Sequence, residues 1–234
     1  MKSTNEIRSR SYEYRKEYLD ETPWWYRGEM HLGFTLVFTC AVIAYCAMQL
    51  RSPALTEWAA VIPLFLFGNW AEWAAHRYLL HRPTKLFSMV YKRHCAVHHR
   101  FFTHVTLEYK GQKEWRALLF PPFAPVAFVL AAVPFAVVIG MLFTRNAGYI
   151  ALLTMAAYYL MYEGLHTLSH ITESRFLDAV PFVNSVRRLH VLHHDPEMMA
   201  TSNFNLTFPI CDTLFGTRKE PATTEKGAEA GATR

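Results

Sequence analysis

The sequence predicts an all-α fold: an integral-membrane four-helix bundle, made of two membrane hairpins, with a cytoplasmic helical cap. Three observations lead to this prediction. Hydrophobic residues make up 52% of the 234 residues. They gather in four blocks separated by polar stretches, whereas a soluble helical protein would repeat them at amphipathic spacing. Basic residues concentrate in one of the connections between the blocks, as expected on one side of a membrane.

The four apolar blocks are the predicted spans, at residues 32–50, 54–75, 117–143 and 147–162. The first contains no charged residue and no proline, and it is long enough to cross a hydrocarbon core of about 30 Å. In the third, the Phe120-Pro121-Pro122 step predicts a bend where an interfacial segment turns into the membrane. A very hydrophobic soluble core is the alternative, and the uncharged first block argues against it.

The connection at residues 76–116 holds nine lysines and arginines, whereas the two short connections hold one basic residue each. Positive charge collects on the cytoplasmic side of membrane proteins. We therefore expect four spans with both termini and the long connection in the cytoplasm, in a bacterial inner membrane or the endoplasmic reticulum. The net charge of +5 is ordinary for such a protein, and no nucleic-acid-binding motif is present.

Three regions follow from these patterns. Residues 1–31 form a cytoplasmic or interfacial N-terminal segment, in which Trp24, Trp25 and Tyr26 resemble an interfacial aromatic belt. Residues 32–219 form the membrane-bound domain. Residues 220–234 are poor in apolar residues and predict a disordered tail.

Eleven of the twelve histidines fall in tight groups between residues 76 and 194. A single histidine is more often structural than a ligand, but the set has the spacings that bring imidazoles together. Residues four apart share a helix face, which predicts three pairs: His94 with His98, His166 with His170, and His190 with His194. The adjacent pairs His98-His99 and His193-His194 point about 100° apart, so one helix end can serve two metal ions. On an α-helix His76 and His81 lie about 140° apart, so we expect them to flank a metal pair or to straddle a helix end.

Ten or eleven histidines are too many for one zinc ion, which takes three or four protein ligands. Divided between two ions they give about five each and leave room for another ligand. Imidazole suits iron, copper, nickel and zinc; two irons fit oxygen chemistry, whereas two zincs would suit hydrolysis. Glu163, one turn before His166, is expected to accept a hydrogen bond from the free N–H of a ligand imidazole and so to orient it. Glu72 is a candidate for the same role, and Asp195 either shares it or ends a helix. The four cysteines form no C-x-x-C pair and predict no disulfide framework.

The histidine motifs resemble those of the fatty acid hydroxylase superfamily, which includes sterol desaturases and fatty acid 2-hydroxylases. The resemblance covers about residues 68–219. Its motifs are HRYLLH at 76–81, HCAVHH at 94–99, EGLHTLSH at 163–170, RRLHVLHH at 187–194 and NFNLTFPICDTLFGT at 203–217. It implies a four-span helical bundle with a cytoplasmic dimetal centre. The implied ligands are His76, His81, His94, His98, His99, His166, His170, His190, His193 and His194.

The sequence departs from the family pattern at the second motif, which reads H-x-x-x-H-H where several branches have H-x-x-H-H. His104 lies outside the motifs and is left out of the ligand set. In the last motif we expect Gly216 to serve a turn and Asp212 to cap local backbone, and a metal contact from Asn203 is the less favoured role.

The resemblance implies two iron ions, with zinc able to replace them in purified samples, and O₂ as co-substrate. The implied reaction is hydroxylation of a lipid C–H bond, and a fatty acyl chain is the leading substrate. Desaturation, or oxidation of a sterol or carotenoid, is the alternative on the same centre. A membrane metal transporter is the alternative of another class, and the position of the histidines at span ends argues against it. The sequence has neither a haem-binding His-Pro-Gly-Gly nor a nucleotide-binding G-x-G-x-x-G motif. Electrons are therefore expected from a separate small haem cytochrome, or from a ferredoxin with its reductase.

Overall fold

The structure is a computed structural model, and it describes residues 3–172 and 174–221. These residues form helices and no strands, in agreement with the predicted all-α class. The long helices are α1 (Thr4–Asp20), α2 (Gly28–Gln49), α4 (Val61–Ala75), α8 (Ala124–Leu142), α9 (Arg145–Ser169) and α11 (Pro181–His193). Shorter elements are α3 (Leu55–Trp58), η1 (His76–Leu80), α5 (Ser88–Tyr91), η2 (Lys92–His98), α6 (His99–Phe101), η3 (Gln112–Glu114), α7 (Trp115–Leu118), α10 (Arg175–Asp178) and α12 (Ile210–Leu214).

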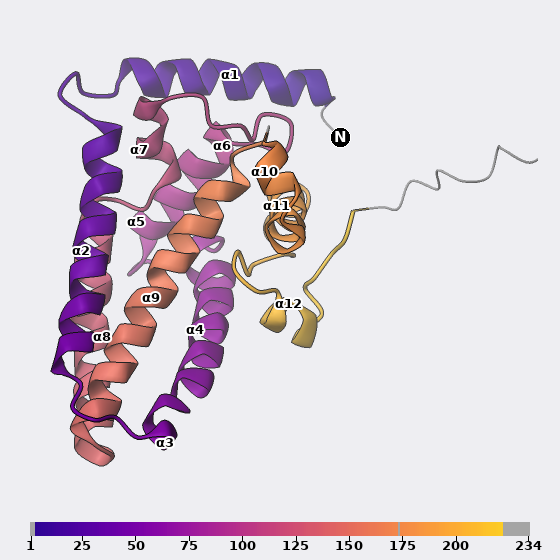
Figure 1. Ribbon diagram of the computed structural model, residues 1–234. Helices are drawn as coiled ribbons and strands as arrows, with labels where there is room; N and C mark the ends of the chain where they lie inside the picture. Colours follow the sequence, from indigo (N-terminus) through magenta and orange to yellow (C-terminus); the bar gives the residue numbers. More distant parts are fainter. Residues whose placement is uncertain (1–2, 173, 222–234) are drawn as a thin grey trace, which may run out of the picture.

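Helices α2, α4, α8 and α9 run alongside one another as a bundle (Figure 1). Helix α9 is its centre and contacts α2, α4, α8 and α11. Helices α8 and α9 approach each other closely, because small residues let the two backbones meet. A Cβ atom on Gly148 would lie 2.8 Å from the Ala136 carbonyl oxygen and 2.9 Å from the Gly140 Cα atom. This contact fixes the α8–α9 hairpin that carries the histidine-bearing end of α9.

Four spans were predicted, and two helices are long and apolar enough to cross a membrane: Gly28–Gln49 and Ala124–Leu142. The second predicted block breaks at Ala59-Ala60 into α3 and α4, and α4 has 15 residues. Helix α9 is long enough, with 25 residues, but it is more polar than α2 and α8. The predicted bend in the third block is confirmed, since α7 ends at Leu118 and α8 begins at Ala124.

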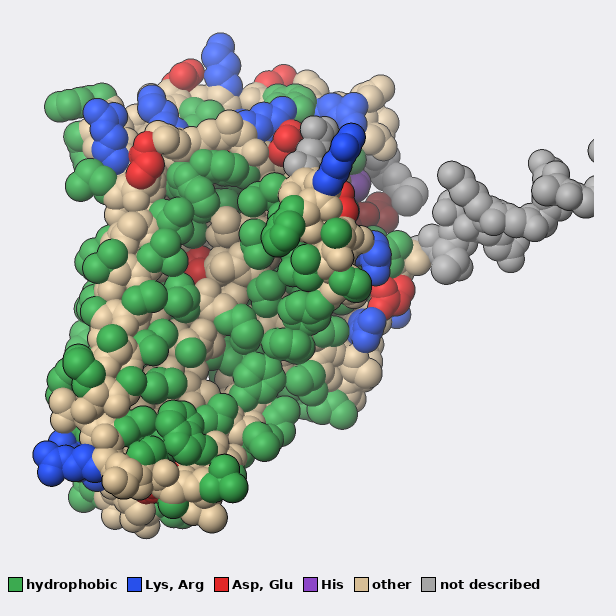
Figure 2. Space-filling view, viewed as in Figure 1, with side chains coloured by type: hydrophobic (Ala, Val, Ile, Leu, Met, Phe, Trp, Pro, Cys, Tyr) green, Lys and Arg blue, Asp and Glu red, His purple; other side chains and the backbone are tan. Residues whose placement is uncertain are grey.

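Charged side chains gather at the α1 end of the molecule, with a smaller basic group at the opposite end, and hydrophobic side chains cover most of the face between them (Figure 2). On α2 and α8, Val37, Met48, Leu130 and Met141 are each more than 60% exposed. At the junction of α1 and α2, Trp24 is 82% and Trp25 is 64% exposed. On the face shown, the surface is therefore mostly apolar along the bundle, and charged side chains gather at its ends and along one edge.

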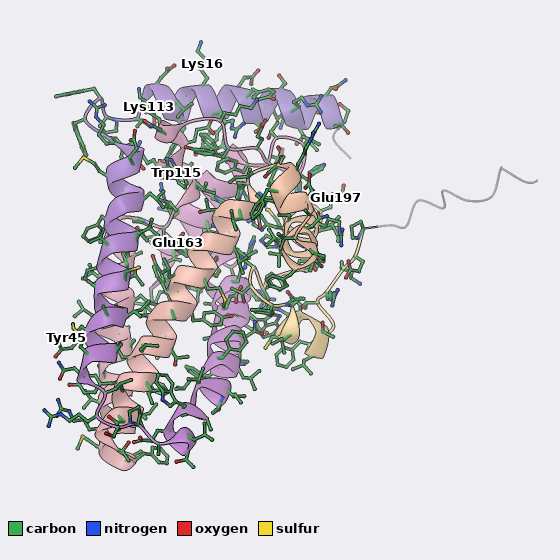
Figure 3. All side chains as sticks on the ribbon, viewed as in Figure 1. Lys16, Tyr45, Lys113, Trp115, Glu163 and Glu197 are labelled. Atoms are coloured by element: carbon green, nitrogen blue, oxygen red, sulfur yellow. The ribbon has the colours of Figure 1, made fainter. Side chains whose placement is uncertain are left out.

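Helix α1 lies across the end of the bundle at which the histidines gather (Figure 1). Its buried face contains Ser11, Arg15 and Tyr18, while Lys16 points away from the molecule (Figure 3). The Arg15 guanidinium donates to the Glu108 carbonyl and lies 3.6 Å from the Glu114 carboxylate. The N-terminal segment thus packs onto the long connection between α4 and α8. Of the predicted disordered tail, only Glu220 and Pro221 belong to the described residues; the rest lies outside them.

Candidate metal centre

Ten buried histidines form two groups of five at the α1 end of the bundle. Within each group the potential ligand nitrogens lie within 4.8 Å of one another. The first group, from η1, η2, α6 and α11, is His76, His81, His94, His99 and His193. The second group, from η2, α9 and α11, is His98, His166, His170, His190 and His194. These are the ten histidines that the sequence predicts as ligands, and they divide five and five as expected.

The pairing of histidines along the chain differs from the prediction in two places, because η1 and η2 are π-helices. A π-helix closes its hydrogen bonds between residues five apart. The His81 N–H therefore donates to the His76 carbonyl, and the His99 N–H to the His94 carbonyl. Each of these i, i+5 pairs joins the first group. The expectation that His76 and His81 flank a metal pair, because an α-helix would hold them about 140° apart, was therefore wrong, whereas His81 does lie just past the end of η1, as the alternative expected.

The same π-turn separates His94 from His98, which lie in different groups although an α-helix would pair them. The two other predicted i, i+4 pairs, on α9 and α11, each stay within the second group. The adjacent pairs His98-His99 and His193-His194 divide between the groups, as their 100° separation predicts. The H-x-x-x-H-H spacing of the second motif is thus accommodated by a π-helix.

In both groups the Nε2 atoms point toward a common centre. In the first group, His94 Nε2 lies 2.9 Å from His76 Nε2, 3.1 Å from His81 Nε2 and 3.0 Å from His99 Nε2. In the second, His98 Nε2 lies 3.2 Å from His194 Nε2 and from His166 Nε2. Two nitrogens bound at about 2.1 Å to one ion and 90° apart would be about 3.0 Å from each other. The Nε2 spacing is therefore that of ligands around an ion.

Backbone carbonyls orient five of the ten rings through Nδ1. In the first group, His76 Nδ1 faces the Phe204 carbonyl and His193 Nδ1 lies 2.9 Å from the Ser202 carbonyl. In the second group, His98, His170 and His194 face the carbonyls of Ala117 (3.1 Å), Leu107 (2.8 Å) and Phe102 (2.6 Å). A carbonyl oxygen only accepts, so each of these rings carries its proton on Nδ1 and has a free lone pair on Nε2.

Burial keeps these imidazoles neutral. It lowers the pKa of His98 to about 3 and of His193 to about 4, and with the neighbouring His193 it lowers that of His81 to about 2. Neutral imidazole is the form that ligates metals. With both rings neutral and protonated on Nδ1, the His98–His194 contact of 3.2 Å is not a hydrogen bond, because two lone pairs face each other. A cation between them would remove this repulsion, so the donor set fits a metal ion.

The carboxylates nearest the histidines do not accept from a ligand imidazole in the described part of the chain. Glu163, which points into the bundle (Figure 3), accepts from the Phe120 N–H and the Tyr159 hydroxyl, and its Oε2 has no partner there. His166 Nδ1, one turn later, also has no partner. Asp195 accepts from the Glu197 N–H where α11 ends, which is the helix-ending role.

Glu72 orients a histidine indirectly, by holding backbone. Its carboxylate accepts from the N–H groups of Leu206 and Thr207, the Thr207 hydroxyl and the Tyr158 hydroxyl. These bonds attach α4 to the segment whose Phe204 carbonyl faces His76 Nδ1. Sequence reasoning missed this arrangement, because backbone carbonyl acceptors leave no signal in residue type.

The C-terminal motif holds that segment in place. Asp212 accepts from the N–H groups of Phe204 (3.0 Å) and Asn205 (2.7 Å), and Gly216 has a positive φ of 67°, so both predicted roles are confirmed. Asn203 also has a positive φ, of 56°, and its amide bonds the carbonyls of Leu189 and Lys219. It therefore has a backbone-holding role in place of a metal contact. His31 lies outside both groups and bonds the Tyr26 hydroxyl and the Phe120 carbonyl.

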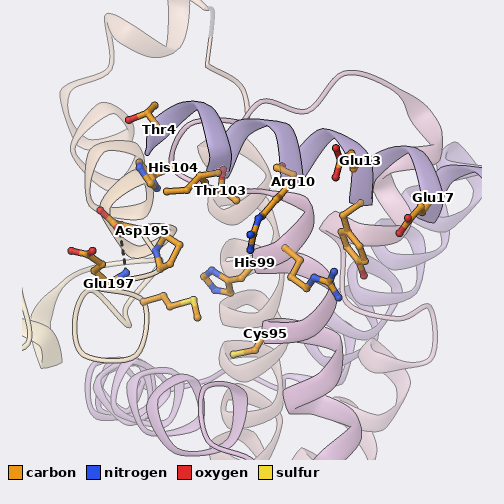
Figure 4. Close-up of a pocket in the computed structure, with 16 residues that line it drawn as sticks. Thr4, Arg10, Glu13, Glu17, Cys95, His99, Thr103, His104, Asp195 and Glu197 are labelled. Atoms are coloured by element: carbon orange, nitrogen blue, oxygen red, sulfur yellow. Dashed lines mark hydrogen bonds between the residues drawn. The ribbon is translucent and has the colours of Figure 1, made fainter. Parts of the chain in front are cut away.

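Two pockets reach the histidine groups. An apolar pocket of about 220 Å³ is lined by His94 of the first group and by His98 and His166 of the second. Its other walls come from residues 89–93, 117–127 and Tyr162. A larger pocket of about 650 Å³ lies under α1, reaches His99, and is lined mainly by polar side chains (Figure 4). The centre is thus approached by one apolar and one polar cavity.

The model of the fatty acid hydroxylase family matches residues 61–217, two thirds of the chain, and this stretch contains all ten grouped histidines. No match was found among the curated proteins or the solved structures. The family match and the two histidine groups agree: the chain belongs to the fatty acid hydroxylase family.

Proposed function

We propose that this protein hydroxylates a lipid C–H bond with O₂, at a centre of two iron ions held by the ten grouped histidines. The contact between His98 Nε2 and His194 Nε2 is the observation that carries the proposal, since two unprotonated nitrogens lie 3.2 Å apart in a buried site. Five imidazoles on each ion leave room for another ligand. When bound, the iron pair supplies the redox chemistry that O₂ activation and C–H oxidation require.

The chain's own contribution is to orient the ligands and exclude water. The carbonyls of Phe204, Ser202, Ala117, Leu107 and Phe102 fix the ring orientation of five histidines, as hydrogen-bond acceptors behind the ligands do in metal sites. Each histidine is at least 93% buried, which keeps the ligands neutral and the site dry. We assign Glu163 a supporting role near the reaction, because its Oε2 is buried, without a partner among the described residues, and one helical turn from His166.

The apolar pocket is the proposed site of the reacting chain. It touches both histidine groups, through His94, His98 and His166. Phe120, Phe123 and Tyr162 contribute aromatic walls, and Arg93 is the one residue with a formal charge along its lining. An apolar cavity beside a redox centre suits an acyl chain, which offers only C–H bonds to the site.

The exposed apolar residues at the mouth support delivery of the substrate from a bilayer. Met89 is 61% and Phe123 is 55% exposed, and both line the pocket. We propose that α4 and α9 cross the membrane together with α2 and α8, with both termini and the metal centre on the cytoplasmic side. The gathering of α1, the basic connection and the histidines at one end of the bundle supports this topology.

Electrons are proposed to come from a separate protein, either a small haem cytochrome or a ferredoxin with its reductase. The described residues show no second cofactor fold beside the helical bundle and its cap. In the proposed reaction this donor supplies the electrons for each turnover.

To test the proposal, the chain is expressed in a host, and the lipids of the host are compared by mass spectrometry with and without the protein. Variants that narrow the apolar pocket are then compared with the wild type. Ala127 lines this pocket, and Ala131, one turn later on α8, does not. Ala127→Phe is expected to lower the yield of hydroxylated lipid at least tenfold while two metal ions remain bound. The control Ala131→Phe is expected to keep both.

Three outcomes overturn the proposal: a new double bond in place of a hydroxyl group, product formation that survives His99→Ala, or metal flux without an O₂-dependent product. A hydroxylated sterol or carotenoid with unchanged fatty acyl chains overturns the choice of substrate.

A further inference from the structure

We propose that the polar pocket under α1 is the loading route by which divalent metal ions reach the buried histidines, and this inference rests on the dimetal site proposed above. The pocket has a volume of about 650 Å³ and opens between α1 and the turn that follows α11. It is distinct from the apolar pocket, with which it shares no lining residue. Three features support this role: the negative charge of the lining, the metal-ligand candidate His99 in its wall, and imidazole nitrogens without a partner among the described residues.

The pocket is acidic, although the whole chain is basic. Asp195 and Glu197 lie on one side and Glu13 and Glu17 on the other (Figure 4). Two arginines also line the pocket. The four carboxylates and two arginines together give the lining a formal charge of −2, whereas the whole chain has +5. Arg10 is paired with Glu6 at 2.8 Å, outside the lining, and the Arg100 guanidinium lies 4.2 Å from the Tyr14 ring centroid. A cleft lined by one sign of charge raises the local concentration of the opposite ion.

One residue that lines the pocket, His99, is a predicted metal ligand. His99 is 5% exposed and lines the pocket, while its Nε2 atom faces His94 Nε2 at 3.0 Å in the first histidine group. Its Nδ1 is buried and has no partner in the described part of the chain. Five other ligand rings are fixed by carbonyls through Nδ1. The His99 ring, like those of His166 and His190, lacks such a bond among the described residues and is less constrained than those five. A ring held less firmly can turn to meet an arriving ion.

Two further donors lie along the way. His104 lines the pocket, and its Nδ1 is also buried without a partner among the described residues, so it offers a second imidazole to an ion in the pocket. Cys95 also lines the pocket, and its Sγ is 3.4 Å from His81 Nδ1, which belongs to the first group. The pocket therefore leads from carboxylates to His99 of the first group, and Cys95 adjoins His81 of the same group. The first group is thus expected to fill before the second.

The experiment follows loading of metal-free protein with Co²⁺, whose bound form absorbs visible light, by stopped-flow spectroscopy. The double variant Glu13→Gln/Glu197→Gln is expected to slow loading about tenfold and to weaken its dependence on ionic strength, because screening acts on the removed charges. His104→Gln is expected to slow loading as well. In each variant the final content is expected to remain two ions per chain, because none of these residues belongs to the histidine groups.

The matched control is Asp20→Asn/Glu21→Gln, which removes two exposed carboxylates at the far end of α1, outside the pocket. It is expected to load at the wild-type rate. The inference is overturned if the pocket variants load as fast as the wild type, if the control slows loading equally, or if the pocket variants bind fewer ions at equilibrium. Wild-type protein that binds no Co²⁺ contradicts the dimetal site itself, so the two failures are distinguishable.

Discussion

The imidazole of His99 stacks on that of His194, with ring centroids 4.3 Å apart and planes inclined by 28°. The two residues belong to different histidine groups. The groups are also linked through the backbone, since His98-His99 and His193-His194 each supply one ligand to either group. The two sites therefore share walls, and a change in one ligand is expected to affect the neighbouring site.

Replacing either stacked histidine tests this connection. His99→Ala or His194→Ala is expected to reduce the metal content from two ions per chain to one or fewer and to abolish hydroxylated product, because a removed ligand also leaves a gap beside the other site. Metal analysis of the purified protein measures this. His31→Gln is the control, because His31 lies outside both groups, and it should retain two ions. Full metal content in His194→Ala would contradict the ligand assignment.

Glu72 is expected to affect metal binding without touching a histidine. Glu72→Ala leaves the buried N–H groups of Leu206 and Thr207 without an acceptor, at a cost of about 1–3 kcal/mol each in the free energy of unfolding. Because these residues hold the Phe204 carbonyl against His76, metal affinity is expected to fall about 10- to 100-fold. Thermal unfolding and metal titration measure the two effects.

Glu72→Gln separates orientation from charge, since its amide oxygen can still accept from the two N–H groups. It should recover most of the lost affinity. Glu108→Ala is the control, because the Glu108 side chain pairs only with Lys110, at 3.9 Å, among the described residues. Equal losses in Glu72→Gln and Glu72→Ala would show that the hydrogen bonds to backbone are not what matters.

The histidine set could be predicted from the sequence because histidines that cluster at helix ends are typical of metal sites and rarely serve packing alone. Their division into groups could be predicted only where the helix is regular. His166 and His170 pair as an α-helix requires, but His94 pairs with His99 because η2 is a π-helix. No residue in KRHCAVH marks a π-turn, and the preference comes from the convergence of side chains in the folded protein.

The spans were predicted with unequal success for a similar reason. The uncharged α2 is recognised by composition alone, whereas α9 combines apolar turns with Glu163 and His166 and is less distinct from a buried soluble helix. The packing of α1 over the centre was not predicted. Its contacts depend on Arg15 meeting the Glu108 carbonyl, 93 residues away, which local patterns do not encode.

Acid is expected to destabilise the metal-free protein. In the folded state burial holds the pKa of His98 near 3 and of His193 near 4, whereas in the unfolded chain histidine has a pKa of about 6.5. Between these values the unfolded chain binds more protons, so the free energy of unfolding falls as the pH drops from about 6.5 to 4. The slope is about 1.4 kcal/mol per pH unit for each extra proton.

The melting temperature, measured from pH 8 to pH 5, should stay level down to about pH 7 and then fall. His98→Gln should show a shallower decline than the wild type, because it removes one of the titrating groups. An unchanged melting temperature down to pH 5 would contradict this prediction, since it would mean that the histidines are not neutral and buried when metal is absent.

The α8–α9 contact is expected to tolerate no added side chain at its centre. In Gly148→Ala the new methyl group would lie 2.8 Å from the Ala136 carbonyl oxygen and 2.9 Å from Gly140, both of them backbone atoms that cannot rotate away. The helices must separate, which is expected to cost about 1–3 kcal/mol in the free energy of unfolding. Gly164→Ala on the same helix is the control, because a Cβ there meets nothing within 4 Å, and it should be neutral or stabilising by up to about 1 kcal/mol. Thermal unfolding of the two variants in the same detergent gives the comparison. Equal melting temperatures would mean that the hairpin is not packed as closely as Gly140 and Gly148 indicate.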